Sequence, residues 1–265
     1  ELYDTEESKV IWSDRWQEEG ENLPSIKGEL AENILNTLNV TTTQEVAKAP
    51  TTNTEAYEFY LKGRYRYEKR ENMEDTEIAR GLVRKAIELD DNLIAANILL
   101  SVTYSSTGNY DKAMEIYLPA FKRAENIQDR RSEASCLRGI GGIYTLKGNY
   151  DKALECSTNS IKIFEELGDK DGIATILTNR GNVYANQGKL GKALEYYNKS
   201  LKLMEALDDK EGIAINNNVI GIIYADRNEQ AKALENYNKA LKIYKEIGDR
   251  YGEGMTMENI GIVYL

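Results

Sequence analysis

Two short stretches of the sequence carry residue types that could do chemistry. The glycine-rich run Gly139–Gly142 could cradle a phosphate on its backbone N–H groups, and Asp169, Asp171 and Gly172 could belong to a calcium-binding loop. The glycines follow no predicted strand, however, and the ligand run of an EF-hand is missing. We therefore interpret the glycine run as helix packing and the aspartate run as a turn.

The rest of the chain offers no catalytic constellation. It has no histidine, which removes the commonest general base and transition-metal ligand, and it has neither a nucleophile elbow nor a phosphate loop of the form GxxxxGK[ST]. Cys136 and Cys156 are twenty residues apart and form no CxxC motif, so they indicate neither a disulfide framework nor a zinc site. The sequence predicts a protein that is not an enzyme and has no catalytic residues, cofactor or metal.

The elements that could position any site are predicted to be helices. Hydrophobic residues make up 41% of the chain and charged residues 29%, enough apolar material for a core, while only three prolines interrupt a composition rich in helix formers. The net charge of −10 makes nucleic acid and anionic lipid poor partners. Since no window approaches the roughly 20 apolar residues of a spanning helix and the N-terminus has no signal pattern, we expect a soluble, cytoplasmic chain without membrane insertion.

The sequence repeats itself at a fixed step of forty residues. Three residue types mark the register: tyrosines Tyr104, Tyr144, Tyr184, Tyr224 and Tyr264, glycines Gly141, Gly181, Gly221 and Gly261, and alanines Ala113, Ala153, Ala193 and Ala233. Within one repeat, Ile173–Gln187 and Leu190–Leu207 each have apolar residues at steps of three or four, with Gly188 between them. Each repeat is therefore predicted to be an antiparallel helical hairpin.

The recurring glycines need a physical reason, because glycine within a helix costs about 0.5–1 kcal/mol relative to alanine. A close approach of the second helix, with its alanine facing the glycine, would compensate for that cost. The tyrosine that follows one turn later would fill the wedge between hairpins. We therefore expect the five repeat tyrosines to lie in the core.

The repeat pattern resembles the tetratricopeptide repeat, with Gly at the eighth position, Tyr at the eleventh, Gly at the fifteenth, Ala at the twentieth and an aromatic residue at the twenty-fourth. That aromatic residue is Tyr117, Tyr197 and Tyr237, but Ser157 in one repeat, where we expect looser packing. The forty-residue period is similar to that of kinesin light chains and G-protein-regulator scaffolds, which bind extended peptides. The resemblance implies an all-α fold, a right-handed superhelix (α-solenoid) of antiparallel helix pairs.

A further repeat is predicted upstream, over residues 54–92. Here Gly63 precedes Ala79 by sixteen residues instead of twelve, so we expect an extra turn or a longer loop near Glu71–Asp75. The repeat domain would then cover residues 54–265, about five and a half repeats, and the last would lack its second helix. The exposed terminal helix could pair two chains into a homodimer.

The first residues do not share the repeat. We expect residues 1–40 to form a small β-hairpin followed by a helix over Leu23–Leu38, and residues 41–53 to form a linker. This arrangement resembles the end of a TolB-like region that precedes repeats in bacterial signalling proteins. In that family such a region often lies C-terminal to a nucleotide cyclase or another output domain. Because the last hairpin also lacks its second helix, the chain is expected to lack residues at both ends of its parent.

The family resemblance also implies a binding face, because the second, fifth, sixth, ninth, twelfth and thirteenth positions of the first helices line the concave groove. On this sequence those positions give the peptide-binding candidates Arg138, Thr175, Thr178, Asn179, Asn182, Asn186, Asn218 and Ile222. Asparagine amides both donate to and accept from a peptide backbone, so we expect the asparagines to hold an extended segment and Arg138 to pair with an acid. Ile215 and Val219 occupy places where the chaperone-type carboxylate clamp needs basic residues, which argues against a heat-shock chaperone tail.

The predicted function is therefore a non-enzymatic interaction module that binds a peptide or protein partner in its concave groove. The alternative is a regulatory or sensory region of a larger bacterial signalling enzyme, such as an adenylate or guanylate cyclase. The gene upstream of Glu1 discriminates between the two.

Overall fold

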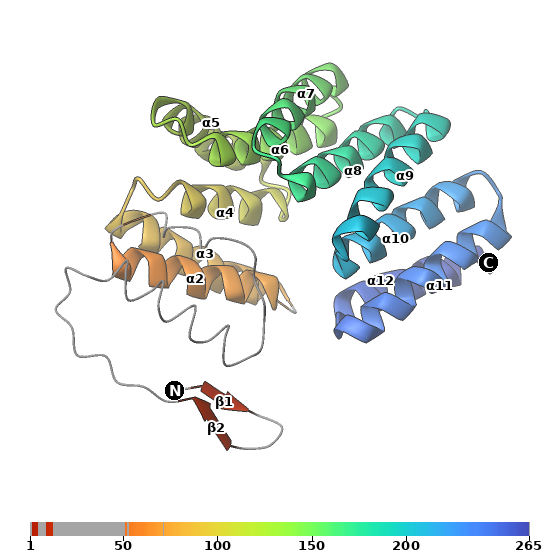
Figure 1. The fold of residues 1–265 in the computed structure, drawn as a ribbon, viewed down its shortest axis with the longest axis horizontal. Coiled ribbons are helices and arrows are strands. Elements are labelled where there is room, and N and C mark those ends of the chain that lie inside the picture. The colour runs from red at the N-terminus through yellow and green to blue at the C-terminus, as the bar shows by residue number, and fades with distance from the viewer. Residues whose placement is uncertain (1, 5–8, 13–50, 52, 71, 265) are drawn as a thin grey trace.

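The computed structural model describes residues 2–4, 9–12, 51, 53–70 and 72–264 (Figure 1). These residues form two short strands and a run of helices. The strands are β1 (Leu2–Asp4) and β2 (Lys9–Trp12), and the helices are α2 (Thr54–Glu68), α3 (Met73–Leu89), α4 (Ile94–Ser105), α5 (Tyr110–Asn126), α6 (Arg130–Leu146), α7 (Tyr150–Glu166), α8 (Lys170–Asn186), α9 (Leu190–Leu207), α10 (Lys210–Asp226), α11 (Gln230–Ile247) and α12 (Arg250–Val263).

The two strands pair antiparallel, with Tyr3 opposite Val10 and a register shift between Leu2 and Tyr3. The helix expected over Leu23–Leu38 and most of the expected linker lie outside the described residues.

The helices form consecutive antiparallel pairs that stack into an arch, from α2 and α3 at one end to α11 and α12 at the other (Figure 1). Each helix packs on the next one in sequence. The first helices of successive pairs also contact one another, α4 on α6, α6 on α8, α8 on α10 and α10 on α12. These first helices form a continuous layer. We call the side of this layer that points away from the second helices the inner face. In the described part of the chain, α12 has no second helix.

The turns between repeats are helix caps. The side chains of Asp129, Asp169, Asp209 and Asp249 each accept a hydrogen bond from the backbone N–H three residues later, at the start of α6, α8, α10 and α12. The Asp169 to Gly172 contact is 2.9 Å long. The aspartate run that could have been part of a calcium loop thus begins a helix.

The first hairpin differs from the later ones between its two helices, where the sequence predicted an extra turn or a longer loop. Helix α3 begins six residues before Ala79, whereas α7 begins only three before Ala153, and the loop 69–72 is one residue longer than the loop 147–149. The four additional residues are therefore divided between an extended start of α3 and the loop. An ion pair of 2.7 Å between Arg66 and Asp75 joins the two helices at this end.

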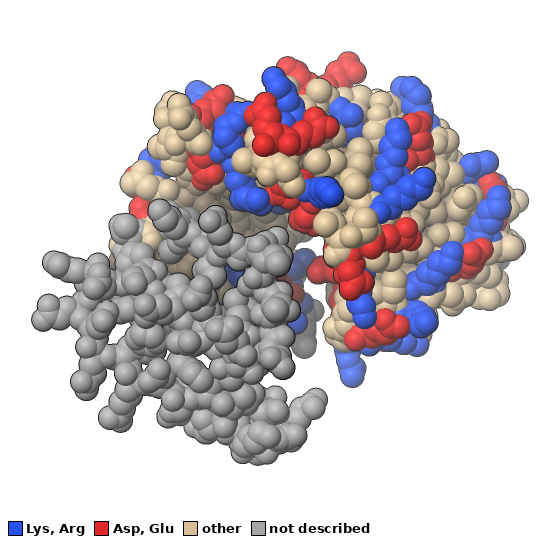
Figure 2. Space-filling view, viewed as in Figure 1, with Lys and Arg blue, Asp and Glu red and all other residues tan. Residues whose placement is uncertain are grey.

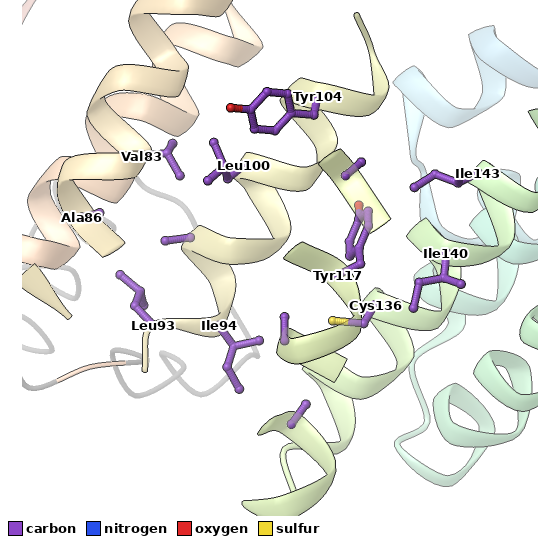
Figure 3. Close-up of a cluster of buried hydrophobic side chains, with 14 of the residues drawn as sticks. Val83, Ala86, Leu93, Ile94, Leu100, Tyr104, Tyr117, Cys136, Ile140 and Ile143 are labelled. Atoms are coloured by element: carbon purple, nitrogen blue, oxygen red, sulfur yellow. The ribbon is translucent and has the colours of Figure 1, made fainter. Parts of the chain in front are cut away.

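The aromatic residues at the twenty-fourth repeat position are deeply buried. Tyr197 and Tyr237 are 2% exposed, and their rings lie where a Cβ on Gly181 or Gly221 would be, so the helical glycines make room for a ring. Tyr117 is equally buried, but it packs on Gly139 of the following hairpin, near Cys136 and Ile140 (Figure 3). Gly139 of the glycine run is therefore used for packing.

The tyrosines at the eleventh position are less buried than predicted. Tyr104 is buried, Tyr144, Tyr184 and Tyr224 are half-buried, and Tyr264 is 74% exposed, so the core prediction was wrong for Tyr264. The reason is their place at the loop end of the hairpin. There a lysine of the next helix covers the ring, with its amine 5.3–5.7 Å from the ring centroid, in the pairs Lys112–Tyr104, Lys152–Tyr144, Lys192–Tyr184 and Lys232–Tyr224.

Both cysteines are shielded thiols. Burial raises the pKa of Cys136 to about 12 and that of Cys156 to about 11, so both remain protonated at neutral pH. Neither forms a disulfide.

Candidate functional site: the inner face of the solenoid

The predicted binding residues lie on three neighbouring first helices. Arg138 is on α6, Thr175, Thr178, Asn179, Asn182 and Asn186 are on α8, and Asn218 and Ile222 are on α10. These helices pack on one another in the order α6, α8, α10, so the predicted residues lie on adjacent helices. Their exposure and their hydrogen bonds differ, however, and divide them into three groups.

Thr178 and Asn218 serve contacts between helices. Thr178 is 8% exposed, and its hydroxyl lies 2.9 Å from Ser200 Oγ and donates to Asn216 Oδ1 at 3.2 Å. Asn218 is 3% exposed and accepts a hydrogen bond of 3.2 Å from Asn259 on α12. The prediction that they meet a ligand is corrected here, because neighbouring helices already cover them.

Asn182 and Asn186 are partly committed. The side-chain oxygen of Asn182 accepts a hydrogen bond of 2.7 Å from the hydroxyl of Tyr197, which fixes the orientation of the amide. Asn186 is exposed, and its backbone carbonyl accepts from the hydroxyl of Tyr150 at 3.2 Å. Both side chains keep hydrogen-bonding capacity at the surface.

Arg138, Thr175 and Asn179 are half-buried, and within the described part of the chain their side chains form no hydrogen bond or ion pair. Ile222 on α10 is also half-buried. The positive charge of Arg138 acts on nearby titratable groups. Burial raises the pKa of Tyr117, and the charge of Arg138 reduces this rise. Burial, and next the negative charges of Asp169 and Asp209, raise the pKa of Asp171. The charge of Arg138 reduces this rise as well.

Asn216, which was not among the predicted binding residues, links α8, α9 and α10. Asn216 is fully buried and donates to the carbonyl of Gly212 at 3.1 Å and to the sulfur of Met204 at 2.8 Å, besides accepting from Thr178. The same repeat position holds Ile176 in the preceding hairpin. An amide at an otherwise apolar position was the signal that could have revealed this network.

The hairpin with Ser157 in place of the aromatic residue is also distinctive. In the other hairpins the twenty-fourth repeat position is a tyrosine, and the residue twenty-three positions after it is isoleucine: Ile140, Ile220 or Ile260. Here that later position is Arg180, whose Nε donates to Ser157 Oγ at 2.7 Å and whose guanidinium also bonds Thr158. A polar pair thus replaces an apolar pair, and a cavity of about 10 Å³ remains beside it, lined in part by Ser157, Gly141 and Asn179.

On the described part of the face in Figure 2, lysine and arginine are interspersed with aspartate and glutamate, without a large patch of one charge. Among the described residues, no group of three or more histidine, cysteine, aspartate or glutamate side chains could hold a metal ion. Nor does any helix among them combine the length and apolarity needed to cross a membrane.

The fold and its inner layer define a solenoid of helical hairpins, and the comparisons identify the family. A model of the tetratricopeptide repeat matches residues 91–166, 132–206 and 172–246, which together cover more than half of the sequence. The chain belongs to the tetratricopeptide repeat family. Such repeats form a typically non-catalytic scaffold for interactions between proteins. No curated protein matches the sequence.

Solved structures share this fold. A Rap protein in complex with Competence and Sporulation Factor is 18% identical, with a TM-score of 0.69 over 85% of this chain and 61% of that one. A Signal Transduction ATPase with Numerous Domains from Pyrococcus horikoshii, which has a tetratricopeptide repeat sensor, is 21% identical, with a TM-score of 0.59 over 91% of this chain and 39% of that one. BtubC from P. vanneervenii is 21% identical, with a TM-score of 0.56 over 80% and 84%. The chain thus spans less than two thirds of the first two proteins.

Proposed function

We propose that the chain is a protein-binding module, a right-handed solenoid whose concave inner face holds an extended segment of a partner. The observation that carries the proposal is the set of half-buried polar side chains, Arg138, Thr175 and Asn179, that find no partner among the described residues. A partly desolvated donor without an acceptor is costly, and a ligand backbone would satisfy it. Asn182 and Asn186 extend the same row along α8.

The Rap protein supports this proposal by analogy, since a related fold was solved with a bound factor. The oriented amide of Asn182 adds a second argument. Because Tyr197 occupies its oxygen, the amide N–H₂ group is the part left for a ligand carbonyl. Extended peptides present such carbonyls at regular intervals.

A displayed library of random linear peptides tests the proposal. We expect wild-type protein to select binders, and we expect the double variant Asn179→Ala/Asn182→Ala to weaken them by up to about 2–3 kcal/mol, measured by titration calorimetry. The matched control is Asn159→Ala/Asn238→Ala, which removes two exposed asparagines from the second helices α7 and α11. Equal affinity of the inner-face variant and wild type would refute the role of these asparagines.

We further propose that the exposed face of α12 can pair two copies of the chain. Met257 and Ile262 are 57% and 61% exposed on this helix, where the other first helices are covered by a second helix. Ile262→Glu is expected to weaken self-association about tenfold or more in sedimentation equilibrium, because a charge would enter an apolar contact. Leu118→Glu, an exposed apolar position on α5, is the control. A wild-type chain that stays monomeric at high concentration would rule out this pairing.

The second candidate function is a sensory region of a larger signalling protein. The signal transduction ATPase, whose tetratricopeptide repeat part is a sensor, is more than twice as long as the stretch that this chain matches. The gene sequence upstream of Glu1 is the test. A nucleotide cyclase or other output domain there would favour the sensory role, and a start codon would favour a free adaptor.

A further inference from the structure

The hairpin of α6 and α7 contains a hollow that a tyrosine ring fills in the two hairpins that follow it. In α9 and α11 the rings of Tyr197 and Tyr237 lie against Gly181 and Gly221. In α7 the equivalent residue is Ser157. A Cβ on Gly141 would therefore meet only the Cβ of Cys156 at 3.1 Å and the carbonyl of Ala153 at 3.4 Å.

The cavity left by the missing ring, about 10 Å³, has room for about one water molecule. Its lining includes the apolar Leu137, Ile176 and Val183. The polar side chains of Arg138, Asn179 and Thr145 also line it, together with Gly142. Arg138, Gly142 and Asn179 are all half-buried, so the hollow reaches the surface between α6 and α8.

Gly142 borders this hollow. A Cβ at this position would meet no atom within 4 Å, so neither packing nor a left-handed backbone requires glycine here. The neighbouring Gly139 and Gly141, in contrast, face the ring of Tyr117 and the atoms of α7. The open space above Gly142 is thus accessible surface rather than part of the core.

The side chains around the hollow are suited to a carboxylate. Among the described residues, Arg138 and Asn179 have no hydrogen-bond partner, although Arg180 on the adjacent turn bonds both Ser157 and Thr158. A guanidinium presents paired N–H donors that match the two oxygens of a carboxylate, and an amide N–H₂ adds another donor. The surrounding segment, residues 101–150, has seven basic and five acidic residues although the whole chain is acidic.

We propose that the hollow bordered by Arg138, Gly142 and Asn179 is a specificity subsite for an aspartate or glutamate side chain of the bound segment. The carboxylate accepts hydrogen bonds from Arg138 and Asn179, and the side-chain methylene lies over Gly142. Ser157 contributes by leaving the space beneath empty. This inference rests on the proposed function of the inner face and specifies what one position of the ligand must be.

The test uses peptides selected from the random library on wild-type protein. We expect an acidic residue to be enriched at one fixed position, and we expect its change to the corresponding amide to weaken binding at least tenfold. With Arg138→Gln the same peptide change should matter less than twofold, because the partner of the carboxylate is gone. Such a double-mutant cycle isolates the pairwise contact from other losses.

The variant Gly142→Ala provides a readout that keeps the fold. Its methyl group enters open space and helps the helix, so the melting temperature should stay the same or rise. Affinity for the acidic peptides should nevertheless fall at least tenfold. Gly191→Ala, an exposed helical glycine of α9 with equally open surroundings, is the matched control and should leave affinity unchanged.

The outcomes separate this inference from the proposed function. Selected peptides that depend on Asn179 and Asn182 but show no acidic position, or that bind Gly142→Ala as well as wild type, would overturn the subsite and leave the inner-face function standing. A library that yields no binder at all would overturn both. Acidic enrichment that disappears with Arg138→Gln would support both.

Discussion

Replacing Tyr197 by alanine is expected to lower the free energy of unfolding by about 3–5 kcal/mol, the range found for removing a large buried aromatic side chain. The ring is 2% exposed and packs on Gly181, and its hydroxyl donates to Asn182 at 2.7 Å. The variant loses both the packing and the hydrogen bond, and it leaves a cavity between α8 and α9. Urea denaturation followed by far-ultraviolet circular dichroism measures the loss.

The adjacent Tyr196 supplies the control for this prediction. It is half-buried and stacks on Tyr184, with 5.2 Å between the ring centroids. Tyr196 buries less surface than Tyr197 in the wild type, and Tyr196→Ala should therefore lower the free energy of unfolding less than Tyr197→Ala does. The lost stacking on Tyr184 should add no more than about 1 kcal/mol to the effect of lost burial. Similar losses for the two variants would show that the twenty-fourth repeat position is not the structural centre of the hairpin.

Replacing Gly181 by alanine is expected to destabilise the protein by about 1–3 kcal/mol, although alanine is the better helix former. A Cβ at this position would overlap the ring of Tyr197, which is held on its other sides by the core. The ring or the helix must therefore shift. The same denaturation experiment measures the change.

Two comparisons make this prediction specific. Gly191→Ala, where a Cβ meets no atom within 4 Å, should stabilise the protein by a few tenths to about 1 kcal/mol. In the background of Tyr197→Ala, Gly181→Ala should become neutral or favourable, because the obstructing ring is absent. A stabilising Gly181→Ala in the wild-type chain would contradict the packing described here.

Much of the helical architecture could be predicted from the sequence, because the spacing of apolar residues directly reflects which side of a helix is buried. The helices expected over Ile173–Gln187 and Leu190–Leu207 are Lys170–Asn186 and Leu190–Leu207 in the structure. The earlier start of the first one is due to Asp169, whose side chain caps the helix. Hydrophobic periodicity does not show where such a cap lies.

The depth of the tyrosines could not be predicted in the same way. Tyr184 and Tyr197 belong to the same hairpin and both recur in the repeat register, yet only Tyr197 faces a glycine of the partner helix. Which ring is enclosed depends on the distance between two helices, and sequence spacing does not contain that distance. The exposed Tyr264 follows the same logic, since no second helix covers α12 in the described chain.

The candidate site was predicted in outline only. The repeat register placed Arg138, Asn179 and Asn182 on neighbouring first helices, and α6 and α8 do pack on one another. It could not show that Thr178 and Asn218 are covered, because their burial depends on how closely α10 approaches α8 and α12. The occupancy of this face by a ligand stays a prediction.

The polar contacts between hairpins have a consequence for assembly of the chain. Hairpins of nearly the same sequence could exchange places or skip a neighbour during folding, since their apolar surfaces are almost interchangeable. The Ser157–Arg180 and Thr178–Asn216 pairs each join residues that no other repeat offers in the same positions. A hairpin packed on the wrong neighbour would leave a polar side chain of one of these pairs desolvated and without a hydrogen bond. The two pairs therefore favour the correct order of the hairpins.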